Sequence, residues 1–530
     1  MRTEKIDQVL VGGRFYPMDQ ENQPFAALAI AGDRIVATGS VAEIDALAPA
    51  GCRRVDLGGR AVVPGLIDSH NHLTWYGFFL NQVDLNGVKS IAELQARISA
   101  HARSLRPGEW LTGGGWEQGA FADKRYPTRH DLDAVVSDRP VVLDRVCYHA
   151  IVVNSRALEL AGITRDTPAP ADGEIRRDAD GEPNGILTEA ACDLVKRHMP
   201  EPSADQKREA LLRAMARANA CGLTSVHSND DGMLRVMQDV RNAGKSTVRI
   251  YLDRTLSLEA VEAAELITGF GDEWLRIGSV KMFVDGSLGA RTAALYEPYS
   301  DEPATRGLMM YAQEDLDALV LASHRKGMQV AIHAIGDRAV DSALDAIERA
   351  VTAHPRADYR HRIIHLQVIN PQIIERLRTL RLIADIQPKF VTGELAWAGD
   401  RVGQERIRWS YAWKSLLDAG VHCAGGSDCP VEPLQPLWGI YAAVTRAAMD
   451  GTPAGGWLPE QRLSVDQAVA LFTRNAAYVS FEEGIKGTLT PGKLADLVVL
   501  GDDPFVVDPL RIKDIRVQMT MVGGKVVYEG

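Results

Sequence analysis

Short strand-like segments alternate with helical segments through most of this chain, and this alternation limits the possible folds more than any other feature. Eight segments resemble strands: VVPGLIDSHNH, LTSVHSN, VRIYLDR, GSVKMFVDG, QVAIHAIG, RIIHLQ, LIADIQP and VHCAGGSD. Amphipathic helical patterns such as LDALVLASHRKG and QIIERLRTLR separate the later ones. Strands that alternate with helices indicate βα units and a parallel sheet, and eight units are the number in a TIM barrel. We therefore predict an α/β fold with a (β/α)8 TIM barrel in residues 61–481.

The two ends of the chain show a different pattern, with short strands broken by glycine turns. Residues 1–60 contain DQVLVGG and AALAIAGDRIVATG, and the last fifty contain LADLVVLGDDP and KVVYEG. Neither end has enough strands for a stable sheet by itself. We expect residues 1–60 and 482–530 to form one small β-sandwich domain together. Residues 78–215 are too many for one βα unit, so we expect a large insertion after the first barrel strand that forms a cap.

Composition excludes several classes of protein. The chain has 530 residues, 46% of them hydrophobic and 24% charged, as in ordinary globular proteins. Its formal net charge of −11 argues against nucleic-acid binding, which needs clustered basic residues. No apolar run reaches the roughly 20 residues that cross a bilayer, and the start MRTEKIDQVLVGG lacks the features of a secretory signal. The six cysteines are scattered without CxxC spacing, which fits reduced thiols and a cytoplasmic protein.

The segment PGLIDSHNHL carries two histidines, His70 and His72, at the end of an apolar run. In a strand, side chains two residues apart face the same side, so both rings can converge on one point. Metal binding is a common reason for such a pair. The motif is short, however, and by itself it more often marks a half-buried strand whose histidines make ordinary hydrogen bonds.

Other metal-competent side chains stand at the same place in later strand segments. His333 ends the fifth, His365 the sixth, and Asp428 the eighth. The carboxyl ends of barrel strands meet at one face, where TIM-barrel active sites lie. Five such residues from four strands therefore predict a metal site.

Lys281, in GSVKMFVDG, adds a different chemistry. Burial in a barrel favours its neutral amine, which can add carbon dioxide to form a carbamate that bridges two metals. The alternative is a salt bridge between Lys281 and Asp285 or another carboxylate, and spacing does not separate the two.

These motifs resemble those of the amidohydrolase superfamily, in particular a branch of large proteins similar to N-substituted formamide deformylases and related metal-dependent hydrolases. The resemblance extends over nearly the whole chain and rests on PGLIDSHNH, GGGWEQ, HAIVVNSRAL, VKMFVDGSLGARTA, HAIGDRA, RIIHLQ, GSDCPVEP and GTLTPGKLADLVVL. The series is specific for the family but not for a substrate.

The resemblance implies a binuclear metal centre. His70 and His72 would hold one metal and His333 and His365 the other, with carbamylated Lys281 between them. Asp428 would bind a metal and the nucleophilic water. Zinc is expected from the ligand types, although imidazole and carboxylate suit other first-row metals. The resemblance is also compatible with a homodimer.

The function implied is hydrolysis of a C–N bond, other than a peptide bond, in a small N-formyl or N-acyl amide. A metal-bound hydroxide would attack the carbonyl, and Asp428 would carry the proton to the leaving nitrogen.

Further residues are candidates for the site. His149 and His227 are candidates to stabilise the oxyanion. Asp285 and Arg291 are candidates to orient Lys281 or the substrate, or to serve the fold alone. Trp75 and Trp116 are candidates to line an apolar pocket, although packing in the core or the cap is the favoured interpretation for most of the aromatic residues in this set. The family usually has tryptophan where this chain has Val152, so the pocket beside His149 is expected to differ in shape.

Two other readings stay open. Superfamily deaminases with one metal also use HxH, a later histidine and a terminal aspartate, but they typically have a glutamate in the region where this chain reads HAIGDRA, with Asp337. The second reading is a binding protein that kept the barrel and lost catalysis. All six ligand positions are filled, which favours an enzyme.

Overall fold

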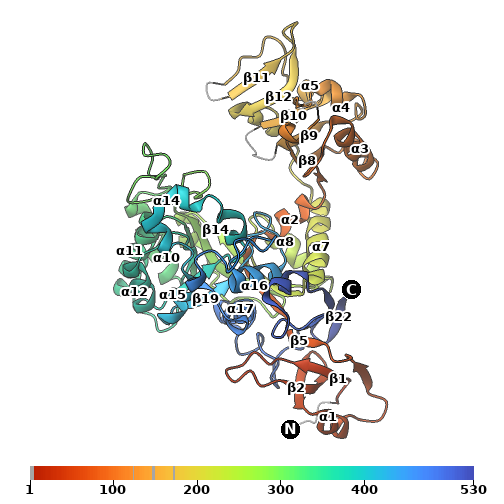
Figure 1. Ribbon diagram of the computed structural model, residues 1–530, viewed down its shortest axis with the longest axis vertical. Helices are drawn as coiled ribbons and strands as arrows, with labels where there is room; N and C mark the ends of the chain where they lie inside the picture. Colours follow the sequence, from red (N-terminus) through yellow and green to blue (C-terminus); the bar gives the residue numbers. More distant parts are fainter. Residues whose placement is uncertain (1–4, 123, 146–149, 171–172) are drawn as a thin grey trace. The chain divides into compact units, whose positions relative to one another are not determined.

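The computed structural model describes residues 5–122, 124–145, 150–170 and 173–530. These group into two compact units, one made of Met1–Tyr76 with Leu211–Gly530 and the other of Gly77–Ala210. Figure 1 shows the course of the chain through both. The residue His149 lies outside the described residues.

The larger unit contains an eight-stranded, all-parallel sheet, which confirms the predicted barrel sheet. Its order is β19-β18-β17-β16-β15-β14-β13-β6. The strands are β6 (Leu66–Asn71), β13 (Leu223–Asn229), β14 (Arg249–Thr255), β15 (Leu275–Phe283), β16 (Val330–Ala334), β17 (Arg362–His365), β18 (Ile383–Ile386) and β19 (His422–Gly425). Sequential strands are therefore neighbours throughout, as in a barrel wound one βα unit at a time.

Helices connect these strands and cover the sheet with their apolar faces. They include α7 (Ala204–Ala220), α8 (Leu234–Asn242), α10 (Gln313–Arg325), α11 (Asp337–Ala353), α12 (Pro371–Thr379), α15 (Trp413–Asp418), α16 (Pro436–Thr445), α17 (Val465–Leu471) and α18 (Arg474–Val479). The helix α12 begins where Asn370 accepts a hydrogen bond from the Ile373 amide and Pro371 occupies the first turn, which has no need of its missing N–H. It buries Ile373, Ile374 and Leu377.

The first predicted strand segment is in fact two strands. β5 (Ala61–Pro64) ends at Pro64, and β6 begins at Leu66. Gly65 separates them, and a Cβ there would lie 2.2 Å from the Thr224 Oγ1 atom, so only glycine allows β6 to pass so close to β13. β5 consequently belongs to another sheet.

Two backbone hydrogen bonds connect the ends of the barrel sheet. The amide of Asp428, after β19, donates to the carbonyl of His70 at 2.8 Å, and the amide of His72 donates to the carbonyl of Cys429 at 2.8 Å. The loop after the last strand is thus fixed against the end of the first strand, and the barrel nearly closes.

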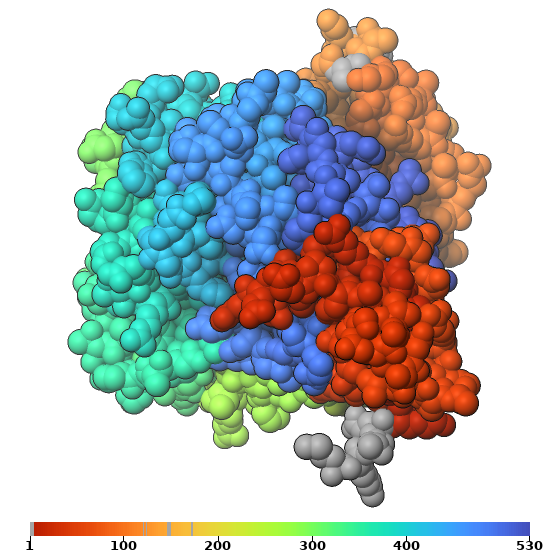
Figure 2. All heavy atoms as spheres, turned by 60° about the horizontal axis from the view of Figure 1, so that its bottom comes forward, coloured from red at the N-terminus to blue at the C-terminus, as the bar shows by residue number. Residues whose placement is uncertain are grey.

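Both termini contribute to a second eight-stranded sheet, of order β22-β21-β20-β5-β1-β2-β3 with β4 beside β1. Its other strands are β1 (Gln8–Phe15), β2 (Phe25–Ala31), β3 (Arg34–Gly39), β4 (Arg53–Asp56), β20 (Leu497–Leu500), β21 (Val517–Val522) and β22 (Lys525–Glu529). The antiparallel pair β5 and β20 joins the two ends of the chain. Figure 2 shows amino-terminal residues in red against carboxy-terminal residues in blue. The prediction that this region forms a sandwich remains a prediction.

Side chains on both faces of the terminal sheet are buried. Leu10, Leu28 and Leu497 belong to one hydrophobic cluster, whereas Val9 and Ala29 belong to another that includes helix α1 (Val41–Leu47) through Ile44. The alternation of adjacent residues between clusters is the period-two pattern of a strand.

The smaller unit contains a six-stranded sheet of order β11-β12-β10-β9-β8-β7. Its strands are β7 (Val83–Asp84), β8 (Leu111–Trp116), β9 (Val141–Arg145), β10 (Ala150–Val153), β11 (Gly173–Arg177) and β12 (Pro183–Glu189). Helix α3 (Ile91–Ala102) buries Ile91, Leu94 and Ile98. That this unit acts as a cap remains a prediction. No helix within the described ranges is both long and apolar enough to cross a membrane.

One buried ion pair links the terminal sheet to the barrel. Arg249, the first residue of β14, donates from Nε and Nη2 to the two carboxylate oxygens of Asp496, at 2.7 and 3.0 Å. The two side chains are only 2% and 4% exposed. Asp496 also accepts a hydrogen bond from the Gly523 amide, in the turn between β21 and β22.

We expect Asp496→Asn to lower the free energy of unfolding by about 3–5 kcal/mol, because a buried guanidinium would lose its compensating charge. Chemical denaturation would measure the effect. The control is Asp45→Asn, which breaks the exposed Asp45–Arg54 pair and should cost less than about 1 kcal/mol. Equal effects of the two substitutions would contradict a stabilising role for the buried pair.

Candidate metal centre

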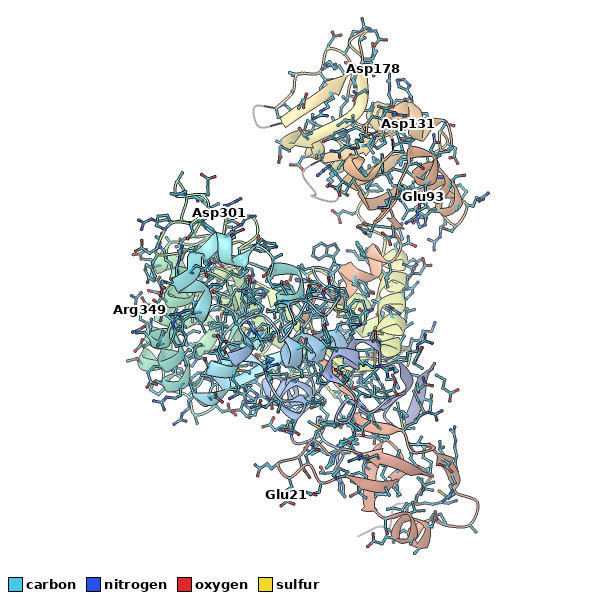
Figure 3. The ribbon with its side chains drawn as sticks, viewed as in Figure 1. Glu21, Glu93, Asp131, Asp178, Asp301 and Arg349 are labelled. Atoms are coloured by element: carbon cyan, nitrogen blue, oxygen red, sulfur yellow. The ribbon has the colours of Figure 1, made fainter. Side chains whose placement is uncertain are left out.

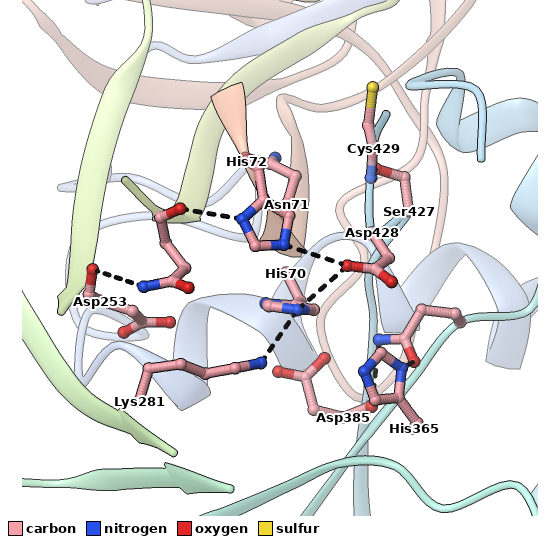
Figure 4. A network of polar contacts seen from close by, with 12 residues as sticks. His70, Asn71, His72, Asp253, Lys281, His365, Asp385, Ser427, Asp428 and Cys429 are labelled. Carbon is pink, nitrogen blue, oxygen red and sulfur yellow. Dashed lines mark hydrogen bonds and ion pairs between the residues drawn. The ribbon is translucent and has the colours of Figure 1, made fainter. Parts of the chain in front are cut away.

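Six side chains predicted from the sequence come from strands, or the loops that follow them, at one end of the barrel. His70, Lys281, His333 and His365 lie within β6, β15, β16 and β17, His72 directly follows β6, and Asp428 lies in the loop after β19. Figure 4 shows His70, His72, Lys281, His365 and Asp428 gathered around a common centre.

Asp428 is the centre of the closest group. Its Oδ1 lies 3.3 Å from the His70 Nε2 and 3.4 Å from the His72 Nε2. The three potential ligand atoms all lie within 4.8 Å of one another. The two loop–strand hydrogen bonds described above place this carboxylate, since they hold the backbone on either side of it against β6.

The other two histidines lie beside this group. The ring centroids of His333 and His365 are 4.4 Å apart, and those of His70 and His365 are 5.7 Å apart. Together the four rings, one carboxylate and one amine form a single polar cluster.

Hydrogen bonds hold one ring nitrogen in three of the four histidines. The Nδ1 of His72 donates to the Asn229 carbonyl at 2.9 Å, and its Nε2 faces the Asp428 carboxylate. The Nε2 of His333 donates to the Gly286 carbonyl at 3.2 Å, which leaves Nδ1 free.

The tautomer of His365 follows from a chain of two hydrogen bonds. Gln387 donates from Nε2 to the Asp385 carbonyl at 3.2 Å, which turns its Oε1 toward His365. The Nδ1 of His365 donates to that oxygen at 2.7 Å, and its Nε2 is free as a ligand. The buried Nδ1 of His70 has no hydrogen-bond partner among the described residues.

Burial keeps two of these four rings, those of His70 and His365, neutral. Burial, together with the nearby Lys281, holds the pKa of His70 well below its ordinary value, and burial and His333 do the same to the pKa of His365. For His72, burial is outweighed by the hydrogen bond and charge of Asp428, so its pKa is raised. Burial acts against ionisation of Asp428, but its hydrogen bonds to His70 and His72 lower its pKa well below the usual range. The carboxylate is therefore ionised.

Lys281 is 1% exposed, and its Nζ lies 3.2 Å from the His70 Nε2. Burial lowers its pKa from 10.5 to about 8, although the charge of Asp428 acts in the opposite direction. An amine with this pKa is partly neutral at physiological pH, which is the form that can react with carbon dioxide.

The donor set fits a divalent metal of the first transition row. Neutral imidazole nitrogens and a carboxylate are the ligands that zinc and similar ions prefer. The rings of His72, His333 and His365 are each fixed by a hydrogen-bond partner of one ring nitrogen, as is usual in metal sites. The residues present therefore suit such an ion.

Three other candidates have clear surroundings. Trp75 is 54% exposed, with its ring 5.6 Å from the His72 ring, so it borders the centre. His227 is fully buried in β13 beside Tyr251, and burial lowers its pKa well below normal. Trp116 is fully buried in the smaller unit and donates a hydrogen bond to the Leu143 carbonyl, so packing accounts for its position. A role for Trp116 in substrate binding remains a prediction, as does a role for His227 in oxyanion stabilisation.

Asp285 and Arg291 serve different parts of the structure. The buried Asp285 accepts backbone hydrogen bonds from Ala294, Ile335 and Gly336, and one of its oxygens lies 3.3 Å from the His333 Nε2. It therefore fixes the segment after His333, and a role in orienting Lys281 remains a prediction. Arg291 pairs with Asp301, which Figure 3 shows at the outer surface.

Sequence reasoning missed Gln387 and Asp385. Both occur in LIADIQP, two residues apart, so their side chains face the same side. The neighbouring strand, β17, ends at His365. Polar residues with period two in an otherwise apolar barrel strand were the available signal.

The larger unit has a parallel eight-stranded barrel sheet, with histidine, lysine and aspartate side chains at the carboxyl ends of its strands. This combination is typical of barrel proteins that bind a metal at that end. The model of the amidohydrolase family matches residues 53–528, and the chain belongs to this family. The resemblance inferred from the motifs is thereby confirmed.

Known relatives cover nearly the full length of the chain. YtcJ of Bacillus subtilis (strain 168), named as an amidohydrolase, is 37% identical over 527 residues, with 98% of each chain covered. An N-substituted formamide deformylase of Arthrobacter pascens is 30% identical over 549 residues, with 99% of each chain covered. The crystal structure of an uncharacterised metal-dependent hydrolase from Pyrococcus furiosus has a TM-score of 0.79 and 31% identity, covering 94% of this chain and 99% of that one.

A titratable carboxyl lies close to the centre without joining it. Glu394, in helix α13 (Phe390–Glu394) after β18, accepts a hydrogen bond from the Gln367 Nε2 at 2.5 Å and another from the Tyr411 hydroxyl. Gln367 is two residues beyond His365. Burial raises the pKa of Glu394 from 4.5 to about 7, although both hydrogen bonds oppose the shift.

Glu394→Gln should change how stability depends on pH. Because the folded protein binds this proton more tightly than the unfolded chain, Glu394 contributes stability below about pH 4.5 that is lost as the pH rises through about 7. The difference in melting temperature, variant minus parent, should therefore increase between pH 5 and pH 8. The exposed Glu405, substituted in the same way, is the control. A pH-independent difference for Glu394→Gln would contradict the raised pKa.

Proposed function

We propose that this chain is a metal-dependent hydrolase that cleaves the C–N bond of a small amide-type substrate, such as an N-formyl or N-acyl amide. The observation that carries the proposal is the convergence of four histidines, Lys281 and Asp428 at the carboxyl ends of the barrel strands.

The proposed metal ligands divide into two groups. His70, His72 and Asp428 are the compact group, and His333 and His365 form the neighbouring pair. Lys281 lies beside His70, where a carbamate on its Nζ would provide an anionic ligand to both groups. We propose two ions per chain, with zinc the expected metal.

A bound divalent metal supplies Lewis-acid polarisation of the substrate carbonyl and lowers the pKa of water. The chain itself supplies proton transfer. Asp428 is ionised, 8% exposed, and next to both His70 and His72, so it can accept a proton from the attacking water and return it to the leaving nitrogen. Trp75 borders the site and would contact the substrate from the side of His72.

The relatives support this reaction class. One of them is named for deformylation of N-substituted formamides, which is cleavage of an amide C–N bond. Another of similar identity is a metal-dependent hydrolase by its description. The acyl group and the amine of the substrate for this chain follow from neither.

A mononuclear deaminase is the second candidate. The observation that favours it is that His70, His72 and Asp428 alone form a compact group able to hold one ion. Metal stoichiometry separates the candidates, because a deaminase would hold one metal per chain and would not need a carbamate on Lys281 to bind it.

The first experiment is metal analysis of protein purified without chelator, combined with a screen of N-formyl, N-acyl and cyclic amides. We expect about two metals per chain and amide hydrolysis. Lys281→Ala should reduce the metal content to one or none and abolish hydrolysis, because the proposed bridging ligand is lost. Asp428→Asn should abolish hydrolysis for want of the proton acceptor.

His422→Gln is the matched control. His422 is also a barrel histidine, but it opens β19 at the opposite end of that strand and bonds to the Asn475 carbonyl. This variant should retain both metal and activity. If the protein holds one metal per chain and Lys281→Ala keeps it, the deaminase is favoured. If the wild-type protein from metal-replete cells contains no metal, both proposed enzymatic functions are wrong.

A further inference from the structure

A group of buried charges spans the barrel interior close to the metal ligands. We call Arg362, Asp253, Asp385 and Ser69 the Arg362 cluster. The Arg362 guanidinium donates to Asp385 Oδ2 from Nε and Nη2 at 3.0 and 2.5 Å, to Asp253 Oδ2 at 2.9 Å, and to the Ser69 carbonyl at 2.6 Å. The three charged side chains are 0% exposed.

The remaining carboxylate oxygens are also satisfied. Asp385 Oδ1 accepts a hydrogen bond from the Ser69 hydroxyl at 2.6 Å. Asp253 Oδ1 accepts two from Ser279, from its amide at 2.8 Å and its hydroxyl at 2.7 Å. One guanidinium and two carboxylates thus tie together β6, β14, β15, β17 and β18.

All of these strands except β14 carry, or lead directly into, a proposed metal ligand or a residue that orients one. Ser69 directly precedes His70, and Ser279 lies two residues before Lys281 on the same strand face. Arg362 lies three residues before His365, and Asp385 lies two before Gln387, which orients the His365 ring. Figure 4 shows Asp253 and Asp385 close to Lys281 and His365.

Stability alone does not explain such a cluster. Replacing buried ion pairs by well-packed apolar side chains is often neutral or stabilising, because desolvation of the charges is costly. A guanidinium with fixed planar geometry, in contrast, sets the distances between the strands it bridges. Charges at this position also act on Lys281 through the low-dielectric interior.

We infer that Arg362, Asp253 and Asp385 are positioning residues that hold the strands bearing His70, Lys281 and His365 at the separation required for metal binding. The inference rests on the proposed metal site. Outer partners of metal ligands typically change metal affinity or activity by about 10–100-fold when substituted.

The test compares Asp385→Asn with Asp496→Asn in the full-length, metal-loaded protein. Both substitutions remove the charge of a buried aspartate that pairs with arginine, but the Arg249–Asp496 pair lies between the barrel and the terminal sheet. Metal affinity is measured by competition with a chelator using Zn²⁺, alongside the melting temperature of the metal-free protein. We expect Asp385→Asn to weaken metal affinity by about tenfold or more, and Asp496→Asn to lower the melting temperature without changing metal affinity.

A milder pair covers the case in which Asp385→Asn does not fold. Ser69→Ala removes only the hydrogen bond from the Ser69 hydroxyl to Asp385. The control, Ser225→Ala in β13, removes a comparable buried hydrogen bond between Ser225 and Lys486. Ser69→Ala should weaken Zn²⁺ affinity, with kcat restored at saturating Zn²⁺, whereas Ser225→Ala should leave affinity unchanged.

Two outcomes have distinct meanings. Unchanged Zn²⁺ affinity in Asp385→Asn or Ser69→Ala, or equal losses in the matched controls, would overturn the positioning role and leave the proposed function intact. Absence of metal binding by the wild-type protein would instead remove the proposed function on which the inference rests.

Discussion

The site depends on the hydrogen bonds that connect the last barrel strand to the first. The amide of Asp428 bonds to the His70 carbonyl, and the His72 amide bonds to the Cys429 carbonyl. Asp428 and the two histidines come from opposite ends of the barrel sequence, and this junction brings them together. Barrel closure and assembly of the ligand group are therefore the same structural event.

Buried charge is the second organising principle of the larger unit. Arg249 with Asp496 joins the terminal sheet to the barrel, and Arg362 with Asp253 and Asp385 crosses the barrel interior. Each charge is compensated by hydrogen bonds as well as by its partner, which is the condition under which buried ions are tolerated. His70 and His365 meet the same requirement differently, because burial keeps both rings neutral and able to donate a lone pair.

Much of the fold could be predicted from local pattern. Strand periodicity identified all eight barrel strands, and the amphipathic period identified α10 and α12. The break at Gly65 could not be predicted, because the requirement for glycine comes from Thr224, in a strand far along the chain. For the same reason the pairing of β5 with β20 was not visible, and the predicted barrel segment began too early.

The sequence by itself determined which side chains stand at the carboxyl ends of the strands, because alternation along a strand is a local property. That was enough to predict a metal-type centre from His70, His72, His333, His365, Lys281 and Asp428. Only the tertiary structure decided how those side chains are oriented and charged. The partners of the rings, such as Gln387 and the Asn229 carbonyl, and the burial that shifts each pKa arise from contacts between different strands, which no single segment of sequence specifies.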